Sequence, residues 1–268
     1  MLNEKKRSGL ILLTAPHIKT AHAFTTRFGG VSRGPYAGLN LSLSAGDDSE
    51  AVQENFRRLC RAVECPPGVS PVVTRQVHGN YAYTVTQADA EAAQYGRVER
   101  EADALVTDLK FVPLVIFAAD CVPILLCDQV RGVIAAVHAG WRGTAADIVG
   151  SAVSAMRALG SDPGDIRAAI GPAISKCCYE TGADVPEAIG AMPGLDAGDF
   201  AEASGSAENK FFVDLKGVNR SRLIYYGVAA ENIFVSQECT YCTDENKYWS
   251  HRRSGNLRGC QAAIIMLV

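Results

Sequence analysis

Histidine is scarce in this sequence, and its scarcity argues against one class of metalloenzyme. The chain has five His among 268 residues, and no two of them form a His-x-His pair. An oxidase of the multicopper kind needs a histidine-rich copper cluster beside a mononuclear copper site. The sequence therefore disfavours that mechanism. The five residues are His17, His22, His78, His138 and His251.

Net charge and long apolar runs are also lacking. The formal net charge is −3, which gives no general attraction for nucleic acid or for an anionic membrane. No apolar run reaches the roughly 18 residues of a membrane span, and Leu10–Leu13 is too short for the core of a signal peptide. We therefore expect no nucleic-acid partner and no membrane insertion, and the sequence predicts no particular oligomeric state.

The nine cysteines are an odd number in a chain long enough to bury a substantial core. Spread along the chain, they are typical of reduced thiols in a cytoplasmic protein rather than of a disulfide framework. Cys239-x-x-Cys242 could bind a metal or cycle between redox states, but it lacks a second pair of the same kind. Cys177-Cys178 is expected to pack against its neighbours.

Apolar periodicity predicts more strands than helices, and several strands follow one another directly. This pattern favours an α/β (α+β) fold, a layered sandwich with mixed sheets, as a single domain over residues 1–268. Residues 88–102 are expected to form an exposed connection, and residues 193–209 a mobile loop. Helices are predicted at 49–63, 144–159, 184–192 and 214–226, and strands at 10–13, 20–26, 69–77, 81–86, 104–107, 113–117, 122–127, 133–137, 166–170, 232–235 and 262–268.

Two chemically active side chains lie where buried strands should stop. Cys121 precedes the apolar run 122–127, and His138 ends the run 133–137 and leads into the turn Gly140-Trp141-Arg142-Gly143. A helix is expected to begin at this turn, and the free N–H groups of a helix N-terminus favour anions. The guanidinium of Arg142 adds a fixed positive charge with a geometry suited to phosphate or carboxylate.

A third residue completes a possible metal site. His78 lies between two predicted strands, and with Cys121 and His138 it matches the ligands of a catalytic zinc with an open fourth position. Such a site lowers the pKa of bound water to roughly 7, and it can also accept copper. Without metal, Cys121 and His138 could instead form a thiolate–imidazolium nucleophile pair, with Asp120 or another acid orienting the histidine.

Six segments, in a fixed order, span most of the chain: TRFGGVS at 26–32, RQVHG at 75–79, ADALVT at 102–107, DCVP at 120–123, HAGWRG at 138–143 and GPAISKCCYE at 171–180. Together they resemble the YfiH-like family. Members of that family are variously described as polyphenol oxidase (laccase domain), purine nucleoside phosphorylase and peptidoglycan editing factor. Each segment alone would be a weak signal, whereas the ordered set is specific.

The resemblance implies a zinc site at His78, Cys121 and His138, with Cys121, His138 and Arg142 in catalysis. It implies phosphorolysis of adenosine, inosine, guanosine and S-methyl-5′-thioadenosine, so that purine nucleosides and phosphate are the partners, with adenosine deaminase activity alongside. The nucleobase-deaminase signature, His-x-Glu followed by Pro-Cys-x-x-Cys, is absent, so deamination would need a different zinc arrangement.

Other activities stay open. The family's fold is an α/β sandwich related to toxin-type cysteine deamidases, which implies as one alternative a cysteine-nucleophile hydrolase or amidase in peptidoglycan precursor editing. The oxidase label implies another, a copper-dependent phenol oxidase. A third alternative is a small-molecule or metal-binding module without catalytic activity.

Arg27, Arg75 and Arg252 are the candidate substrate-binding or phosphate-binding residues. Arg27 lies in a glycine-flanked loop, and Arg252 lies in YWSHRR at 248–253, which resembles a family segment; a structural turn is the alternative for both. Where the family then commonly has Thr-Gly-Arg, this chain has Arg258-Gly259-Cys260, so Arg258 is the candidate replacement for the family's arginine. Asp103 is expected to cap a turn or to hold a ligand histidine.

Overall fold

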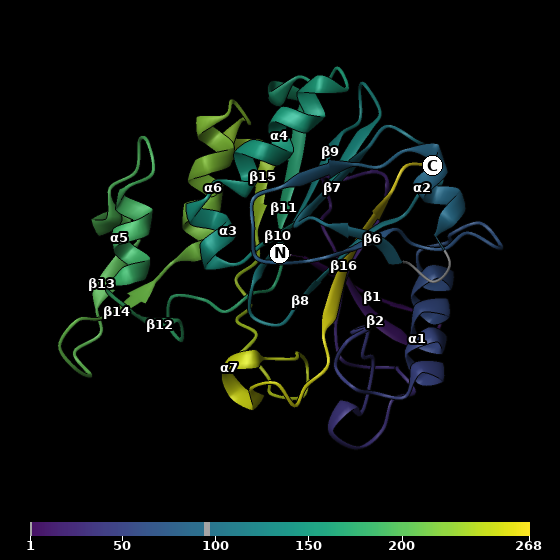
Figure 1. The fold of residues 1–268 in the computed structure, drawn as a ribbon, viewed down its shortest axis with the longest axis horizontal. Helices are drawn as coiled ribbons and strands as arrows, with labels where there is room; N and C mark the ends of the chain where they lie inside the picture. Colours follow the sequence, from purple (N-terminus) through teal and green to yellow (C-terminus); the bar gives the residue numbers. More distant parts are fainter. Residues whose placement is uncertain (1, 94–96) are drawn as a thin grey trace.

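The computed structural model describes residues 2–93 and 97–268, and two large sheets dominate it (Figure 1). The first sheet has the order β1-β2-β3-β16-β8 and the second β15-β11-β9-β10-β7-β5. The first contains β1 (Asn3–Arg7), β2 (Leu10–Thr14), β3 (Ala21–Thr25), β8 (Leu114–Ala118) and β16 (Gln261–Met266). The second contains β5 (Ala82–Thr84), β7 (Ala104–Thr107), β9 (Val122–Asp128), β10 (Val133–Ala139), β11 (Ile166–Ile170) and β15 (Ile233–Val235).

Two smaller sheets flank the large ones. One has the order β12-β14-β13, and the other pairs β4 with β6. In the second large sheet, β5–β7 and β11–β15 are parallel pairs and the others are antiparallel, so the expectation of mixed sheets is confirmed. The bounds are β4 (Val73–Arg75), β6 (Arg97–Glu101), β12 (Glu180–Gly182), β13 (Ala201–Ala203) and β14 (Lys210–Val213).

Helices cover the outer faces of the two large sheets, so the molecule is layered (Figure 1). Successive side chains of β9 point alternately into two different cores, which fixes this arrangement. Ile124 and Leu126 enter a core shared with α4 and α6, whereas Leu125 and Cys127 enter the core between the two sheets. Because β9 is buried on both faces, it reads as an uninterrupted apolar run. The helices are α1 (Ser49–Ala62), α2 (Gln87–Ala92), α3 (Trp141–Ala145), α4 (Ile148–Ala158), α5 (Asp184–Gly190), α6 (Leu215–Tyr225) and α7 (His251–Ser254).

The helix predicted at 144–159 is confirmed over residues 148–158 as α4, but its start is wrong, because residues 144 and 145 belong to the separate helix α3. Asp147 separates them in a left-handed conformation with φ 65°, and its side chain caps α4 at the N–H of Gly150. A side-chain network holds Asp147 there. Its Oδ2 accepts hydrogen bonds from Nη2 of Arg222 at 2.7 Å and from the hydroxyl of Tyr226 at 2.6 Å.

Three further predictions need correction. The strand predicted at 69–77 shrinks to β4, and directly after it the side-chain amide of Gln76 forms two hydrogen bonds with the backbone of Phe117. Residues 88–102, predicted as an exposed connection, contain most of α2 and all of β6, and 94–96 lie outside the described residues. The loop predicted at 193–209 contains β13, which pairs with β14. The exposed, charged strand β1 was not predicted.

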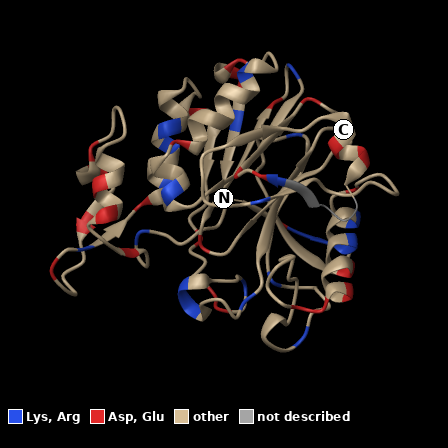
Figure 2. Ribbon diagram, viewed as in Figure 1, with Lys and Arg blue, Asp and Glu red and all other residues tan. Residues whose placement is uncertain are grey.

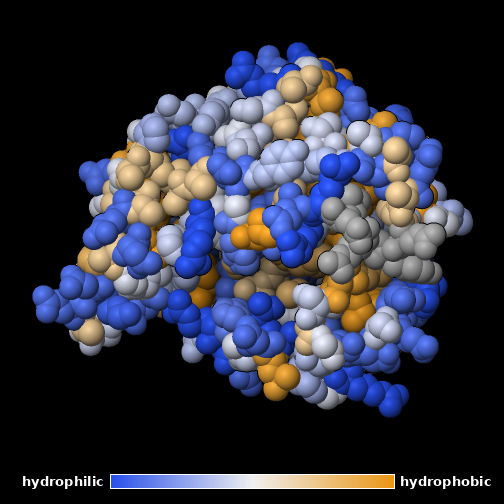
Figure 3. All heavy atoms as spheres, viewed as in Figure 1, coloured by the Kyte–Doolittle hydropathy of each residue, from blue (hydrophilic) through white to orange (hydrophobic). Residues whose placement is uncertain are grey.

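Figure 2 shows charges of both signs on α1, only acidic residues on α5 and only basic residues on α7. The face seen in Figure 3 is largely hydrophilic, with apolar residues in small groups. Across residues 2–93 and 97–268, no helix has the length and apolar character needed to cross a membrane.

Candidate active and metal-binding site

The three predicted ligands come together at one end of the second large sheet. His138 lies at the end of β10 paired with Pro123, and Cys121 directly precedes β9, so the antiparallel pairing brings the two side chains close. His78 arrives from the loop between β4 and β5, in a left-handed conformation with φ 60°. The potential ligand atoms of all three lie within 4.8 Å of one another.

Gly140 makes room for this cluster. A Cβ atom at this position would lie 2.8 Å from Cδ2 of His78 and 3.2 Å from Sγ of Cys121. Real Cβ atoms essentially never approach other atoms as closely as 2.8 Å, so any larger residue would displace the His78 ring. The rings of His78 and His138 meet edge to face, with centroids 4.8 Å apart.

Asp103 organises the cluster from behind. Its buried carboxylate accepts a hydrogen bond from Nδ1 of His138 at 2.8 Å and hydrogen bonds from the backbone N–H groups of Val77, His78 and Gly79 at 2.8–3.1 Å. Burial alone would raise the pKa of Asp103, but these hydrogen bonds bring it below its ordinary value. The prediction that Asp103 holds a histidine is confirmed, and the tautomer that results leaves Nε2 of His138 free to act as a ligand.

The electrostatics favour a thiolate beside an imidazolium. Burial opposes ionisation of Cys121, but the charges and hydrogen bonds of His138 and His78 lower its pKa below that of an ordinary thiol. Burial also opposes a charged His138, but the Cys121 thiolate and Asp103 raise its pKa. A thiolate and two imidazole nitrogens are the donor set that zinc prefers, so these residues fit the metal. Without metal, Cys121, His138 and Asp103 have the groups needed for a nucleophile, a base and an orienting acid, and the acid that contacts His138 is Asp103 rather than Asp120.

A cavity of about 740 Å³ opens beside the cluster, a size suited to a small-molecule ligand. His78 and Cys121 line it, together with two aromatic walls, Trp141 and Tyr179. Its lining also includes residues that the sequence reasoning missed, among them Gln76, Tyr179 and His251. Tyr179 and Gln76 do lie within the family-like segments, which is the signal that could have identified them.

Four of the five candidate arginines line this cavity, Arg27 being the exception. Arg142 stacks on Trp141 with its Cζ 4.3 Å from the ring centroid, and Arg75 forms an ion pair with Glu101. Arg252 donates hydrogen bonds to the carbonyls of Cys178 and Glu180. The expectation that a helix begins at the turn of residues 140–143 is confirmed, because α3 begins at Trp141, but this helix has only five residues.

Arg27 does not line the cavity. Its guanidinium packs over the ring of Trp249, 4.0 Å from the centroid, and its Nε donates to the carbonyl of Ala37. This arrangement matches the structural alternative for Arg27.

Arg258 does line the cavity, and its buried Nε has no hydrogen-bond partner among the described residues. An unpaired buried N–H group is costly unless a ligand satisfies it.

Asp120, the neighbour of Cys121, has a role that was not predicted. Its carboxylate accepts hydrogen bonds from the hydroxyls of Thr240 and Ser250 and from the backbone N–H of Arg252. Asp120 adopts φ 85°, a region that side chains rarely occupy. It therefore ties the Cys121 turn to two segments near the C-terminus.

Comparisons with known proteins place the chain among bacterial relatives. A purine nucleoside phosphorylase of Deinococcus radiodurans is 41% identical over 259 residues, covering 97% of this chain and 94% of that protein. The purine nucleoside phosphorylase YlmD of Geobacillus stearothermophilus is 36% identical over 266 residues, covering 98% and 96%. The purine nucleoside phosphorylase YfiH of Escherichia coli is 34% identical over 262 residues, covering 97% and 100%.

Solved structures agree with these relatives. The YfiH protein of Bacillus licheniformis superposes with a TM-score of 0.90 at 32% identity, over 99% of each chain. The YlmD protein of Geobacillus stearothermophilus gives a TM-score of 0.86 at 34% identity, over 99% of this chain and 98% of that one. A family model described as multi-copper polyphenol oxidoreductase laccase matches residues 21–268. On these matches, the chain belongs to the YfiH/YlmD family that this laccase model describes.

Proposed function

We propose that this chain is a zinc-dependent purine nucleoside phosphorylase with adenosine deaminase activity, acting as a single domain over residues 1–268. The observation that carries the proposal is the convergence of His78, Cys121 and His138 beside the 740 Å³ cavity. The names of the relatives support the reaction class. The proposed substrates are phosphate with adenosine, inosine, guanosine or S-methyl-5′-thioadenosine. Nine unpaired cysteines support a cytoplasmic location.

The protein's own residues prepare the metal ligands. A zinc ion held by His78, Cys121 and His138 would supply Lewis-acid chemistry. Asp103 keeps the proton of His138 on Nδ1, which directs Nε2 to the site. The hydrogen bonds of Asp103 to the backbone of residues 77–79 hold the His78 loop in the same arrangement.

The cavity walls supply binding and orientation. In phosphorolysis, an oxygen of phosphate bonds to C1′ of the ribose while the bond from C1′ to the base breaks. Arg142 and Arg252 would neutralise and position the phosphate, because guanidinium groups match phosphate oxygens in geometry. Trp141 and Tyr179 would pack against the purine. Arg258, which also lines the cavity, would donate to the substrate. In deamination, water adds at C6 of the purine and ammonia leaves.

The test is replacement of His138 by Ala. We expect this variant to lose the metal of the His78–Cys121–His138 site and to lose phosphorolysis and deamination together. His17→Ala is the matched control, because His17 does not line the cavity, and it should keep both activities. Unchanged phosphorolysis by a His138→Ala protein whose His78–Cys121–His138 site is metal-free would refute the role of zinc in that reaction.

A second function is favoured by one observation: in space, His138 lies between Cys121 and Asp103. A metal-free cysteine hydrolase acting on an amide, such as a peptidoglycan precursor, would use them as nucleophile, base and orienting acid. The expected kinship of the fold with toxin-type cysteine deamidases would support it. Rapid alkylation of Cys121 in chelator-treated protein, with amidase activity that needs no zinc, would favour this reading over the phosphorylase.

A copper-dependent phenol oxidase is the alternative that the laccase description suggests. A Cys/His₂ site can accept copper, but five histidines supply no histidine-rich cluster. Assays of adenosine with phosphate, and of a phenol with oxygen, each with and without chelator, separate the readings. A phosphorylase releases adenine and ribose 1-phosphate, whereas a binding module without catalytic activity turns over neither substrate.

A further inference from the structure

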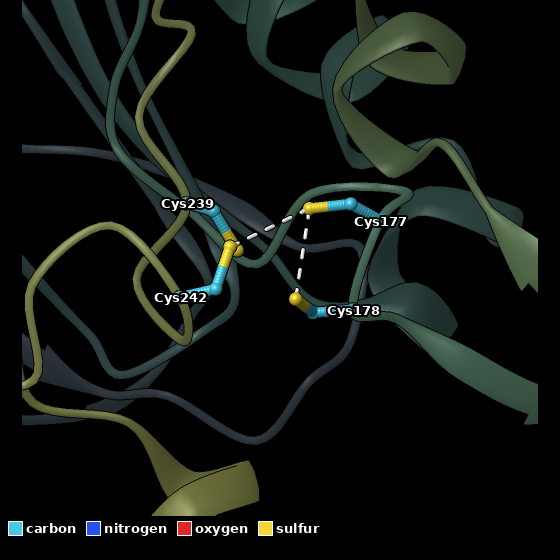
Figure 4. Close-up of side chains that lie close together, drawn as sticks. All are labelled: Cys177, Cys178, Cys239 and Cys242. Atoms are coloured by element: carbon cyan, nitrogen blue, oxygen red, sulfur yellow. Dashed lines mark hydrogen bonds between the residues drawn. The ribbon is translucent and has the colours of Figure 1, made fainter.

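Four cysteines gather at a second place in the molecule, on two loops of the second large sheet. Cys177 and Cys178 follow β11, and Cys239 and Cys242 follow β15. Their side chains point toward one another (Figure 4), and the four sulfur atoms lie within 4.8 Å of each other. The sequence reasoning treated Cys239-x-x-Cys242 as a lone pair and expected Cys177-Cys178 to pack against its neighbours. The fold instead supplies the second pair.

The sulfur spacing matches that of metal ligands better than that of a disulfide. Sγ of Cys177 lies 3.6 Å from Sγ of Cys178 and 3.7 Å from Sγ of Cys242. A disulfide needs a separation of about 2.0 Å. Four sulfurs around a tetrahedral zinc, each at about 2.3 Å, lie about 3.8 Å apart. The two separations at Cys177 are therefore close to the tetrahedral value, and all four sulfur atoms lie within 4.8 Å of one another.

Backbone N–H groups prepare Cys239 to be a thiolate. The N–H of Ser175 points at its sulfur at 3.3 Å, and the N–H groups of Tyr241 and Cys242 also donate to it. A C-x-x-C turn whose N–H groups face its first sulfur is thus ready for a cation.

A buried lysine lies close to the same cluster. Lys216 on α6 is 5% exposed, and its ammonium donates to the carbonyls of Ser236 and Glu238 at 2.8 and 3.2 Å. Burial lowers the pKa of Lys216, whereas the negative charge of Asp214 opposes that effect. A zinc ion with four thiolates carries a net charge of about −2, and the lysine would offset part of it.

We propose that Cys177, Cys178, Cys239 and Cys242 bind one structural zinc ion, separate from the site at His78, Cys121 and His138. Four protein thiolates fill the tetrahedral shell and leave no position for a substrate, which is typical of structural rather than catalytic zinc. The cluster lies at the surface, with Cys177 and Cys242 exposed, so the metal can enter directly.

The position of the cluster indicates which parts of the fold the metal would connect. The two loops already touch, because Ala173 pairs with Cys239 as a single parallel bridge. The first loop continues into Tyr179, which lines the cavity, and the carbonyl of Cys178 accepts a hydrogen bond from Arg252. Zinc would fasten this wall of the cavity to the loop after β15.

The experiment is zinc analysis by native mass spectrometry of protein made in zinc-supplemented medium and purified without oxygen. We expect about two zinc ions per wild-type chain, and about one in each of two variants, His138→Ala and Cys239→Ser with Cys242→Ser. Cys65→Ser is the matched control, because Cys65 is a half-buried thiol outside both clusters and should leave two ions bound. Since each variant removes a different ion, the result does not depend on the phosphorylase activity.

Cobalt substitution gives an independent test of the four-cysteine site. Charge-transfer absorbance from thiolate to cobalt grows with the number of thiolates, so the four-cysteine site should absorb roughly four times as strongly as the site with one. We expect most of this band to survive in His138→Ala and to vanish in the double cysteine variant.

Thiol labelling of the wild-type chain keeps the test valid even where the cysteine variant fails to fold. Cys177 and Cys242 are exposed, yet in zinc-loaded protein they should resist iodoacetamide until a chelator is added. Immediate alkylation in the zinc-loaded protein would overturn the proposal. A Cys177–Cys242 disulfide in the freshly purified chain, or only one bound zinc that disappears in His138→Ala, would overturn it as well.

Discussion

Replacing Asp103 by Asn tests how far one buried carboxylate organises the histidine–cysteine site. The carboxylate accepts four hydrogen bonds, two at each oxygen: His138 Nδ1 and the His78 N–H at Oδ1, and the N–H groups of Val77 and Gly79 at Oδ2. Asparagine keeps one acceptor and presents an NH₂ group in place of the other. The NH₂ group would therefore face two N–H donors and leave them unpaired.

The expected loss follows from these two donors. An unsatisfied buried N–H group costs roughly 1–3 kcal/mol, so the variant should lose about 2–6 kcal/mol of unfolding free energy. His138 also loses the charged partner that orients its ring, and loss of such a partner typically weakens metal binding about 10- to 100-fold. Both losses have the same origin and should appear together.

Two measurements check the prediction. Urea unfolding of chelated protein gives the free energy, and competition with a chromophoric chelator gives the zinc affinity of the site. Asp108→Asn makes the same chemical change at an exposed carboxylate and should alter neither. An Asp103→Asn protein with wild-type stability and wild-type zinc affinity would show that the four hydrogen bonds do not organise the site.

Three further predictions concern the helices and the cavity. Asp147→Asn should destabilise the fold by about 3 kcal/mol at neutral pH, because it breaks a largely buried pair with Arg222. Burial raises the pKa of Asp147, but the larger effect of its charged and hydrogen-bonded partners, Arg222 first, brings it below the ordinary value. The stabilisation is therefore complete above about pH 4 and is lost as pH falls toward the pKa of the folded protein. Urea unfolding of the wild-type and variant proteins across pH should show the difference in their stability shrinking in acid. Gly140→Ala should keep the fold, by circular dichroism, but weaken zinc binding at least 10-fold by displacing His78. Unchanged affinity would contradict the crowding expected of a Cβ atom there. Arg258→Met should raise the KM for nucleoside or phosphate at least 10-fold with little change in melting temperature, and an unchanged KM would remove Arg258 from the substrate contacts.

Continuous apolar runs predicted the strands well, because each run coincides with the buried strand that it forms. Residues 104–107 and 166–170 were predicted with the bounds that the structure has, since both are continuous apolar runs buried in a sheet. The convergence of His78, Cys121 and His138 was also anticipated, through residues at strand ends and through the family resemblance. Their roles in metal binding and catalysis stay predictions.

The errors come from partners that are distant along the chain. Asp147 ends α3 because Arg222 and Tyr226 hold its carboxylate, and a helical period carries no trace of that contact. The four-cysteine cluster likewise needs the parallel pairing of β11 with β15, which brings two separate sequence motifs together. Neither feature can be predicted from the spacing of nearby residues.

The place of β16 in the first sheet has a consequence for synthesis of the protein. β16 lies between β3 and β8, so these two strands have no hydrogen-bonded neighbour in common until residues 261–266 exist. A nascent chain must therefore hold two incomplete sheet edges while most of the molecule is already made, and such edges are prone to aggregate. We expect arrested nascent chains that stop before Gln261 to remain protease-sensitive and bound to chaperones, and chains that expose Met266 to become resistant.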